Sequence, residues 1–311
     1  MSIDINFFKK VLHKISLKKL FNRTYFYIKG SRGKFKINGT YDHTLKDYLI
    51  RLPYYDRFLP HLSSINKKMV IDIGANIGDT MTLIKSVSNV DIVCVEPDNQ
   101  FLNILKQNIS ENNFNNVTIY PFAISSNQKN ILIKKNDVES TGFIIESDEG
   151  IPTKTFEELI NELNIDFSDV GIVKIDTDGY DWDCLSSLYQ YLDKNQLDLD
   201  YIFYEHQTAI NSKLNNIQIR KDGEKKYLKS LKNLSSIGFN QYFIFDNFGS
   251  FITHTTNLEL LQNIVKYTRK SQLDNKKPSI YFCDILITKN KNVESTFYAI
   301  KMLDKNTISV L

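Results

Sequence analysis

Residues 70–80 constrain the fold of this chain more than any other stretch of its sequence. They begin with a mostly apolar run, Val-Ile-Asp-Ile, continue through Gly74 and Gly78, and lead into a helical pattern that starts near Asp79. A short apolar run that ends at a glycine predicts a buried strand of a parallel sheet. A strand, a glycine-rich turn and a helix, in this order, predict a place where a nucleotide-containing ligand is held.

The alternation of apolar strands and helical patterns continues along the chain. Seven strands are expected, at residues 70–73, 91–95, 117–122, 170–175, 200–204, 241–245 and 280–287. Residues 130–146 alternate more like an antiparallel pair, and Thr155 with Glu158 has the spacing of a capping box. Repeated strand–helix units favour an α/β fold, namely a Rossmann-like, doubly wound, mostly parallel seven-stranded sheet with helices on both faces.

Charge and cysteine content narrow the classes of function. The net charge is +3, but residues 1–38 contain ten Lys or Arg and one acid, Asp4, so this leader carries +9 and the rest of the chain −6. So weak an overall charge argues against a dedicated nucleic-acid binder. Cys94, Cys184 and Cys283 are too far apart to indicate a zinc site or a disulfide framework. Together with the lack of a membrane-length apolar run, this favours a cytoplasmic protein without stable membrane insertion.

The glycine-rich turn departs from the fingerprint of dinucleotide-binding folds. Asn76 stands where that fingerprint has its second glycine, Gly78 comes one residue early, and Asp72 places a negative charge where a diphosphate would lie. A cofactor without phosphate and with a positively charged end fits better, and S-adenosylmethionine has both properties. Glu96 ends the next strand, where a carboxylate can accept hydrogen bonds from ribose hydroxyls. The expected cofactor residues are Asp72, Gly74, Asn76, Gly78, Thr80, Glu96, Ala123 and Asp176.

Three motifs together resemble the FkbM family of methyltransferases. They are residues 72–78 followed by Glu96-Pro97, then Pro-Phe-Ala-Ile-Ser at residues 121–125, and Val-Lys-Ile-Asp-Thr-Asp-Gly at residues 173–179. That family consists mostly of bacterial O-methyltransferases, so the resemblance implies O-methylation of a sugar, a glycan or a related natural product. The chain departs from the family at Thr177-Asp178, where Val-Glu is more usual. The substrates of other family members are therefore a weaker guide to the substrate of this chain.

Methyl transfer from a sulfonium requires alignment of the acceptor and, for a hydroxyl, removal of its proton. Asp176, Glu205 and His206 follow two neighbouring strands and are the catalytic candidates, with Asp178 as a further carboxylate. His206 can act directly as a base, or it can make an ordinary loop hydrogen bond. Asp176 with Glu205-His206 also resembles the magnesium site of catechol-type O-methyltransferases, but imidazole is a poor magnesium ligand, so no metal is expected.

Three segments are expected. Residues 1–65 form a helical extension that serves as a lid with Tyr41, Asp42, His43 and Tyr54 facing the acceptor, as a contact in a homo-oligomer, or as packing on the sheet. The basic leader could instead dock on an anionic membrane or partner, but its apolar stripe is narrow and broken by lysines, so packing or self-association is favoured. Residues 66–290 form the methyltransferase domain, and residues 291–311 form a C-terminal tail. Two other functions stay open: a nicotinamide-dependent oxidoreductase, which Asn76 argues against, and a non-catalytic binding or scaffold protein that retains the cofactor fold.

Overall fold

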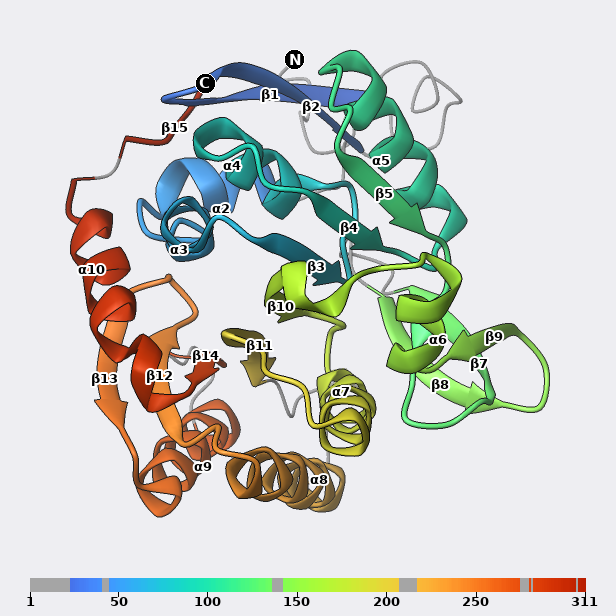
Figure 1. Ribbon diagram of the computed structural model, residues 1–311, viewed down its shortest axis with the longest axis vertical. Helices are drawn as coiled ribbons and strands as arrows, with labels where there is room; N and C mark the ends of the chain where they lie inside the picture. Colours follow the sequence, from blue (N-terminus) through green and yellow to red (C-terminus); the bar gives the residue numbers. More distant parts are fainter. Residues whose placement is uncertain are drawn as a thin grey trace, which may run out of the picture.

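The protein is built around one twisted eight-stranded sheet with helices on both faces (Figure 1). The computed structural model describes residues 23–40, 45–135, 142–206, 217–274, 280, 282–305 and 307–311. The strand order is β13-β12-β14-β11-β10-β3-β4-β5. In chain order the strands are β3 (Met69–Ile73), β4 (Ile92–Val95), β5 (Val117–Tyr120), β10 (Val170–Ile175), β11 (Tyr201–His206), β12 (Gln241–Asp246), β13 (Phe251–Thr255) and β14 (Cys283–Thr288).

Five neighbouring strands of this sheet, from β11 to β5, run parallel, and β14 and β13 run antiparallel to their neighbours. The α/β doubly wound fold predicted from the sequence is confirmed, with eight strands in place of seven. The extra strand is β13, which a tight turn at residues 246–250 folds back onto β12. From β3 the chain continues outward through β4 to β5 and then returns to β10 on the other side of β3. The strand order therefore reverses beside β3, and ligands bind sheets of this kind at such a point.

Two hydrophobic clusters cover the two faces of the sheet. One face packs against α3 (Phe58–Asn66), α4 (Asp79–Val87), α5 (Asn99–Glu111) and α10 (Val293–Leu303). The other packs against α6 (Phe156–Glu162), α7 (Asp181–Asn195), α8 (Ile217–Ser236) and α9 (Leu258–Asp274). Burial from both sides explains why the parallel strands read as continuous apolar runs, as in β10, where all six residues are buried.

The N-terminal segment is not wholly helical, which corrects the sequence-based expectation. A hairpin of β1 (Arg23–Gly30) and β2 (Gly33–Thr40) joins β15 (Ser309–Val310) in a three-stranded sheet over α4 and α5 (Figure 1). In β1, Phe26 and Ile28 are buried while Tyr25 is exposed, so the pattern has the period of a strand. Two helices do follow, α2 (Leu45–Arg51) and α3. Residues 1–22 of the expected helical extension and the residues Tyr41, Asp42 and His43 lie outside the described residues.

Residues 291–311 are an integral part of the fold and not a loose tail. Helix α10 packs against α3, and β15 pairs with β1. None of the helices in the described ranges is long and apolar enough to cross a membrane.

The antiparallel segment expected near residues 130–146 is confirmed. It belongs to a separate four-stranded sheet in the order β6-β9-β7-β8, inserted between β5 and α6. Its strands are β6 (Ala123–Ile124), β7 (Asn130–Lys135), β8 (Gly142–Ser147) and β9 (Ile151–Lys154). The capping box of Thr155 and Glu158 begins α6 as predicted. The insertion places Ala123 beside the carboxyl ends of the central strands, where it contributes to a pocket.

Candidate active site

A pocket lies where β3, β4 and β10 end. Five of the eight expected cofactor residues line it, namely Gly74, Asn76, Glu96, Ala123 and Asp176. The other three do not: Asp72 is buried in β3, Gly78 caps the N-terminus of α4, and Thr80 lines a second pocket. Apolar side chains that include Phe101, Phe122 and Ile124 complete the lining.

Gly74 is required by the backbone as well as by any ligand. Its φ of 84° lies in the left-handed region. A Cβ atom built there would lie 1.8 Å from the carbonyl oxygen of Asp176, because the ends of β3 and β10 approach closely at this residue. The glycine therefore fixes the junction of two strands that are far apart in the sequence, and a larger residue would disturb the fold as well as fill the pocket.

Glu96 ties the glycine-rich turn to the end of β4. Its Oε2 accepts a hydrogen bond from the backbone N–H of Asn76 at 2.8 Å, and its Oε1 accepts one from the N–H of Asp98 at 2.8 Å. Burial raises the pKa of Glu96 to about 7, against an ordinary value of 4.5. Each carboxylate oxygen has a second lone pair, so Glu96 retains the capacity to bind hydroxyl groups in the pocket that it lines.

Lys174 is a buried lysine in the centre of the site, and the sequence motif that contained it gave no hint of this role. Its ammonium nitrogen lies 3.0 Å from Asp72 Oδ1, 3.5 Å from Asp176 Oδ2 and 3.5 Å from the carbonyl oxygen of Gly74. Burial alone would lower the pKa of Lys174, but the carboxylates of Asp72 and Asp176 hold it well above its ordinary value. Lys174 thus stays charged and links Asp72 of β3 to Gly74 and Asp176, which line the pocket.

Asp181, at the start of α7, holds the loop that follows β10. Its carboxylate accepts hydrogen bonds from the backbone N–H groups of Thr177 and Gly179, at 3.0 and 3.1 Å, and from the Tyr227 hydroxyl at 3.1 Å. Burial raises the pKa of Asp181 to about 7. This buried acid fixes the pocket-lining residues that follow β10, and sequence reasoning missed it.

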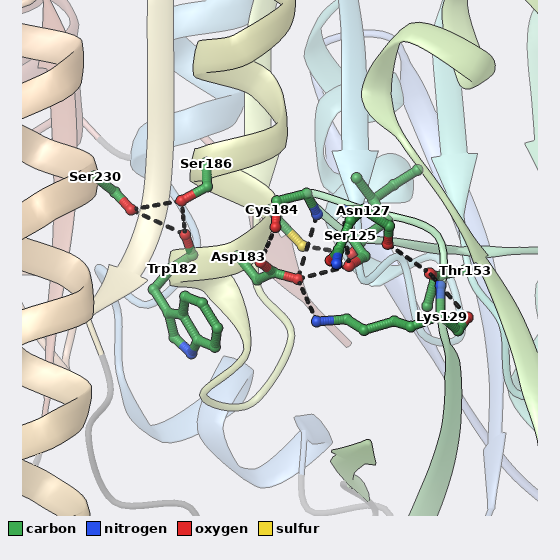
Figure 2. Close-up of polar contacts among 11 residues, drawn as sticks. Ser125, Asn127, Lys129, Thr153, Trp182, Asp183, Cys184, Ser186 and Ser230 are labelled. Atoms are coloured by element: carbon green, nitrogen blue, oxygen red, sulfur yellow. Dashed lines mark hydrogen bonds and ion pairs between the residues drawn. The ribbon is translucent and has the colours of Figure 1, made fainter. Parts of the chain in front are cut away.

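The next acid of α7, Asp183, fixes the opposite wall of the pocket. Figure 2 shows its carboxylate joined to Lys129 and to the segment that begins at Ser125. The Ser125 and Ser126 hydroxyls donate to it at 2.7 and 2.5 Å, and the Lys129 ammonium lies 3.1 Å away. Burial alone would raise the pKa of Asp183, but these contacts hold it below its ordinary value. The network fixes residues 125–129, which follow directly on the lining residues at 122–124.

The family model of the methyltransferase FkbM domain matches residues 72–237, more than half of the 311-residue chain. The chain belongs to the FkbM methyltransferase family. The match covers the glycine-rich turn, Glu96, the inserted sheet and the loop after β10, which are the parts that form the pocket. Among curated proteins, none matches the chain.

Solved structures are similar to this FkbM methyltransferase at low sequence identity. An O-methyltransferase from Bacillus cereus in complex with SAH aligns over 75% of this chain and 80% of its own, with 11% identity and a TM-score of 0.39. A putative caffeoyl-CoA O-methyltransferase from Staphylococcus aureus aligns over 74% and 80%, with 14% identity and a TM-score of 0.37. The plantazolicin methyltransferase in complex with SAH aligns over 77% and 84%, with 13% identity and a TM-score of 0.35.

Glu205 and His206 of the FkbM methyltransferase point to opposite faces of the sheet, because consecutive side chains of a strand alternate. Glu205 pairs with Asp284 of β14, on the face of Phe203. The His206 ring packs against that of Tyr227 with centroids 4.1 Å apart, and its Nδ1 lies 3.1 Å from the Tyr204 hydroxyl. Burial lowers the pKa of His206 to about 3. His206 lines neither pocket, which corrects its expected place at the acceptor.

The residues considered for a magnesium site, Asp176, Glu205 and His206, are also separated, because Glu205 and His206 point to opposite faces of the sheet. Across the described ranges, no three His, Cys, Asp or Glu side chains are grouped so that they could hold a metal ion. Tyr180 and Tyr204 are buried in the core beneath α7 and α8, so they act in packing. Trp182 is partly buried, with the Lys226 ammonium 4.0 Å from its ring centroid.

A second pocket is lined by Lys174 and by Tyr54, a residue of the N-terminal segment that the sequence predicted to face the acceptor. Its aromatic lining residues are Tyr54, Phe58, Phe203 and Phe245, and its polar lining residues are Asp56, Thr80, Lys174 and Asp284. Asp56 and Asp284 were not identified from the sequence. They come from a loop before α3 and from the start of β14, and neither position carries a recognisable motif.

Proposed function

We propose that this methyltransferase binds S-adenosylmethionine in the first pocket and transfers its methyl group to a hydroxyl of a sugar, a glycan or a related natural product. The observation that carries the proposal is the position of Glu96. Its buried carboxylate lines a pocket together with the glycine-rich turn and already accepts the N–H of Asn76. This is the place where folds of this kind hold a ribose.

The residues present fit this cofactor. Glu96 can accept hydrogen bonds from ribose hydroxyls, and Phe101, Phe122 and Ile124 offer an apolar surface for the flat adenine ring. Asp176 lines the same pocket, and its negative charge favours a positively charged methionyl end. When bound, the cofactor supplies an activated methyl group on a positively charged sulfur.

The chain's own residues then orient the acceptor and take its proton. Asp176 lies at the pocket rim with 45% of its side chain exposed, and its Oδ2 is 3.5 Å from the Lys174 ammonium. A carboxylate in this position can accept a proton from a nearby hydroxyl. Glu205 is buried and lines neither pocket, but it is in register with Asp284, which lines the second pocket, so we assign it to positioning. His206 lies on the opposite face of the sheet and takes no part in this proton transfer.

We propose that the acceptor is a small molecule or glycan and not a nucleic acid, since the net charge of the chain is only +3.

The three cysteines are free and buried, which supports a reducing, cytoplasmic location. Residues 1–65 are also proposed to contribute to self-association. The acceptor choice rests in part on the family's usual chemistry.

Cofactor binding is the first test of this function. The melting temperature of the purified protein should rise with S-adenosylhomocysteine and S-adenosylmethionine and should not change with NAD, because a ligand stabilises the state that binds it. Stabilisation by NAD alone would favour the oxidoreductase. Binding of S-adenosylhomocysteine without methyl transfer from labelled S-adenosylmethionine to any acceptor would favour the non-catalytic binding protein.

A further inference from the structure

The second pocket combines aromatic surface with two accessible acids. Tyr54 and Phe203 are partly exposed, whereas Phe58 and Phe245 are almost fully buried. The three phenylalanine rings form one cluster, with the Phe58 and Phe245 centroids 4.5 Å apart and the Phe58 and Phe203 centroids 6.0 Å apart. Asp56 and Asp284 are only partly buried, so their carboxylates can meet a ligand.

Two carboxyl groups, those of Asp56 and Asp284, line this pocket together with one lysine, Lys174. Burial, together with the negative charges of Asp176 and Asp72, raises the pKa of Asp56 to about 6, although the positive charges of Lys174 and Arg57 act in the opposite direction. The pKa of Asp284 is also raised, by burial and then by Asp56 and Asp176. Lys174 lines the pocket, but its ammonium is already paired with Asp72. A ligand with an anionic group would therefore meet two carboxyl groups and a lysine whose charge is already balanced by Asp72.

One side chain connects the second pocket with the cofactor pocket. Lys174 lines the second pocket, while its ammonium contacts the Gly74 carbonyl and the Asp176 carboxylate, both of which line the first. Thr80, which also lines the second pocket, lies in the first turn of α4, directly after the glycine-rich turn. The two pockets thus share a boundary.

The loop that carries Asp56 is held in place by buried contacts. Arg57 is 2% exposed, and its guanidinium donates to the carbonyl oxygens of Tyr55 and Leu49, both at 3.0 Å. On the other side, a Cβ atom at Gly249 would lie 2.2 Å from the Tyr54 carbonyl oxygen, so the β12–β13 turn packs directly against this loop. The pocket is preformed, because both of its acidic walls are rigidly attached to the fold.

We propose that the second pocket is the acceptor site and that it accepts a polyhydroxylated ring without any anionic group, with Asp56 and Asp284 receiving its hydroxyl hydrogen bonds and Tyr54 and Phe203 contacting its apolar face. This proposal rests on the proposed methyl transfer and adds the charge class of the acceptor. Neutral sugars and amino sugars fit the site, whereas phosphorylated sugars and uronic acids do not.

Selectivity is tested by titrating D-glucose, D-glucosamine and D-glucose 6-phosphate into the full-length protein saturated with S-adenosylhomocysteine, followed by saturation-transfer NMR. Glucose and glucosamine should bind, and glucose 6-phosphate should bind at least about tenfold more weakly, because an unpaired like charge costs affinity. Equal or tighter binding of the phosphate, or no binding of the other two sugars, overturns the proposal. Calorimetry with S-adenosylhomocysteine on the same sample keeps the proposed function separately testable.

Location is tested with Asp56→Asn and Asp284→Asn. Each should weaken sugar binding by about tenfold and leave the affinity for S-adenosylhomocysteine unchanged. Asn tolerates the left-handed φ of 55° at position 56, so the first variant keeps the loop conformation. Asp169→Asn is the matched control, because Asp169 is an exposed acid directly before β10, at the opposite edge of the sheet. Unchanged sugar binding in both variants, with normal folding, shows that the acceptor binds elsewhere.

Discussion

The ammonium nitrogen of Lys174 lies 3.0 Å from Oδ1 of Asp72, and both side chains are buried, with Lys174 also lining the second pocket. The two residues face each other across neighbouring parallel strands, since Lys174 of β10 is in register with Asp72 of β3. A buried ion pair gains little over an apolar pair of the same size, but removing one partner leaves an uncompensated charge. The stability of the fold is therefore sensitive to the replacement of either Lys174 or Asp72 alone.

Lys174→Met should lower the free energy of unfolding by about 3–5 kcal/mol, because Asp72 is then buried without its cation. Asp72→Asn combined with Lys174→Met should cost clearly less than the sum of the two single changes. Urea denaturation of the three variants measures this coupling. Additive losses would show that the two side chains do not interact in the folded protein.

Glu96→Ala should weaken the binding of S-adenosylhomocysteine by about 1.5–3 kcal/mol, the range for hydrogen bonds to a charged group. Isothermal titration calorimetry gives the affinity, and a thermal melt shows whether the protein is still folded. Glu259→Gln, at an exposed acid in the first turn of α9, is the control and should leave the affinity unchanged. Reduced turnover with normal cofactor affinity would contradict the ribose-binding role of Glu96.

Asp176→Asn and His206→Ala should have different effects on methyl transfer. Asp176→Asn should lower turnover by about 10²-fold with little change in cofactor affinity, because Asp176 lies at the rim of the pocket and can take a proton. His206→Ala should leave turnover within about threefold and lower stability, since it removes a ring packed against Tyr227. Single-turnover rates with labelled S-adenosylmethionine distinguish the two. A 10²-fold loss in the folded His206 variant would place that ring at the reaction after all.

Asp56→Asn should stabilise the protein in a pH-dependent way. Burial raises the pKa of Asp56 from 3.8 to about 6, so the folded protein retains a proton that the unfolded chain has already lost between these values. Ionised Asp56 thus destabilises the fold as the pH rises through this window, and fully above it. At pH 8 the variant should gain about 1–3 kcal/mol, the lower end being expected because Asp56 is partly exposed, and at pH 5 about half as much. An equal gain at both pH values would indicate another cause.

The parts of the site that the sequence predicted are those encoded by contiguous residues. The turn from Gly74 to Gly78 and the carboxylate of Glu96 each follow a strand whose apolar run is visible in the sequence. Lys174 was missed because its partner, Asp72, lies on another strand, and only the register of β3 with β10 brings the two together. The opposite orientation of Glu205 and His206 follows from the alternation of side chains along a strand, a rule that the sequence reading did not apply there.

Outside the site, the β1–β2 hairpin was missed for a related reason. Its strands alternate between buried and exposed residues, as Tyr25 and Phe26 show, but the surface that buries them belongs to α4 and α5. No local signal indicates that surface. Similarly, β15 pairs with β1 across almost the entire length of the chain, so residues 291–311 read as a tail.

The side chain of Asn108, which is fully buried in α5, connects this hairpin to the glycine-rich turn between Gly74 and Gly78. Its Oδ1 accepts the N–H of Asn38 at 2.8 Å, and its Nδ2 donates to the carbonyl oxygens of Asn38 at 3.1 Å and Ile77 at 2.8 Å. One turn later, Asn112 makes the corresponding pair of hydrogen bonds to the backbone of Lys36, and its Nδ2 also donates to the carbonyl oxygen of Asn108. Asn108 therefore holds the glycine-rich turn as well as the hairpin, whereas Asn112 bonds to the hairpin and to α5.

Asn108→Ala should lower the free energy of unfolding by about 2–4 kcal/mol, because buried groups of Asn38 and Ile77 lose their partner. It should also weaken S-adenosylhomocysteine binding by about fivefold or more, since the turn that follows Gly74 is no longer held to α5. Asn112→Ala is the matched control: it should cost about 1–2 kcal/mol at the hairpin edge and leave the cofactor affinity unchanged. Urea denaturation and calorimetry on both variants separate the two effects. Equal loss of cofactor affinity in both would mean that the hairpin as a whole supports the pocket and that the bond to Ile77 has no special part in it.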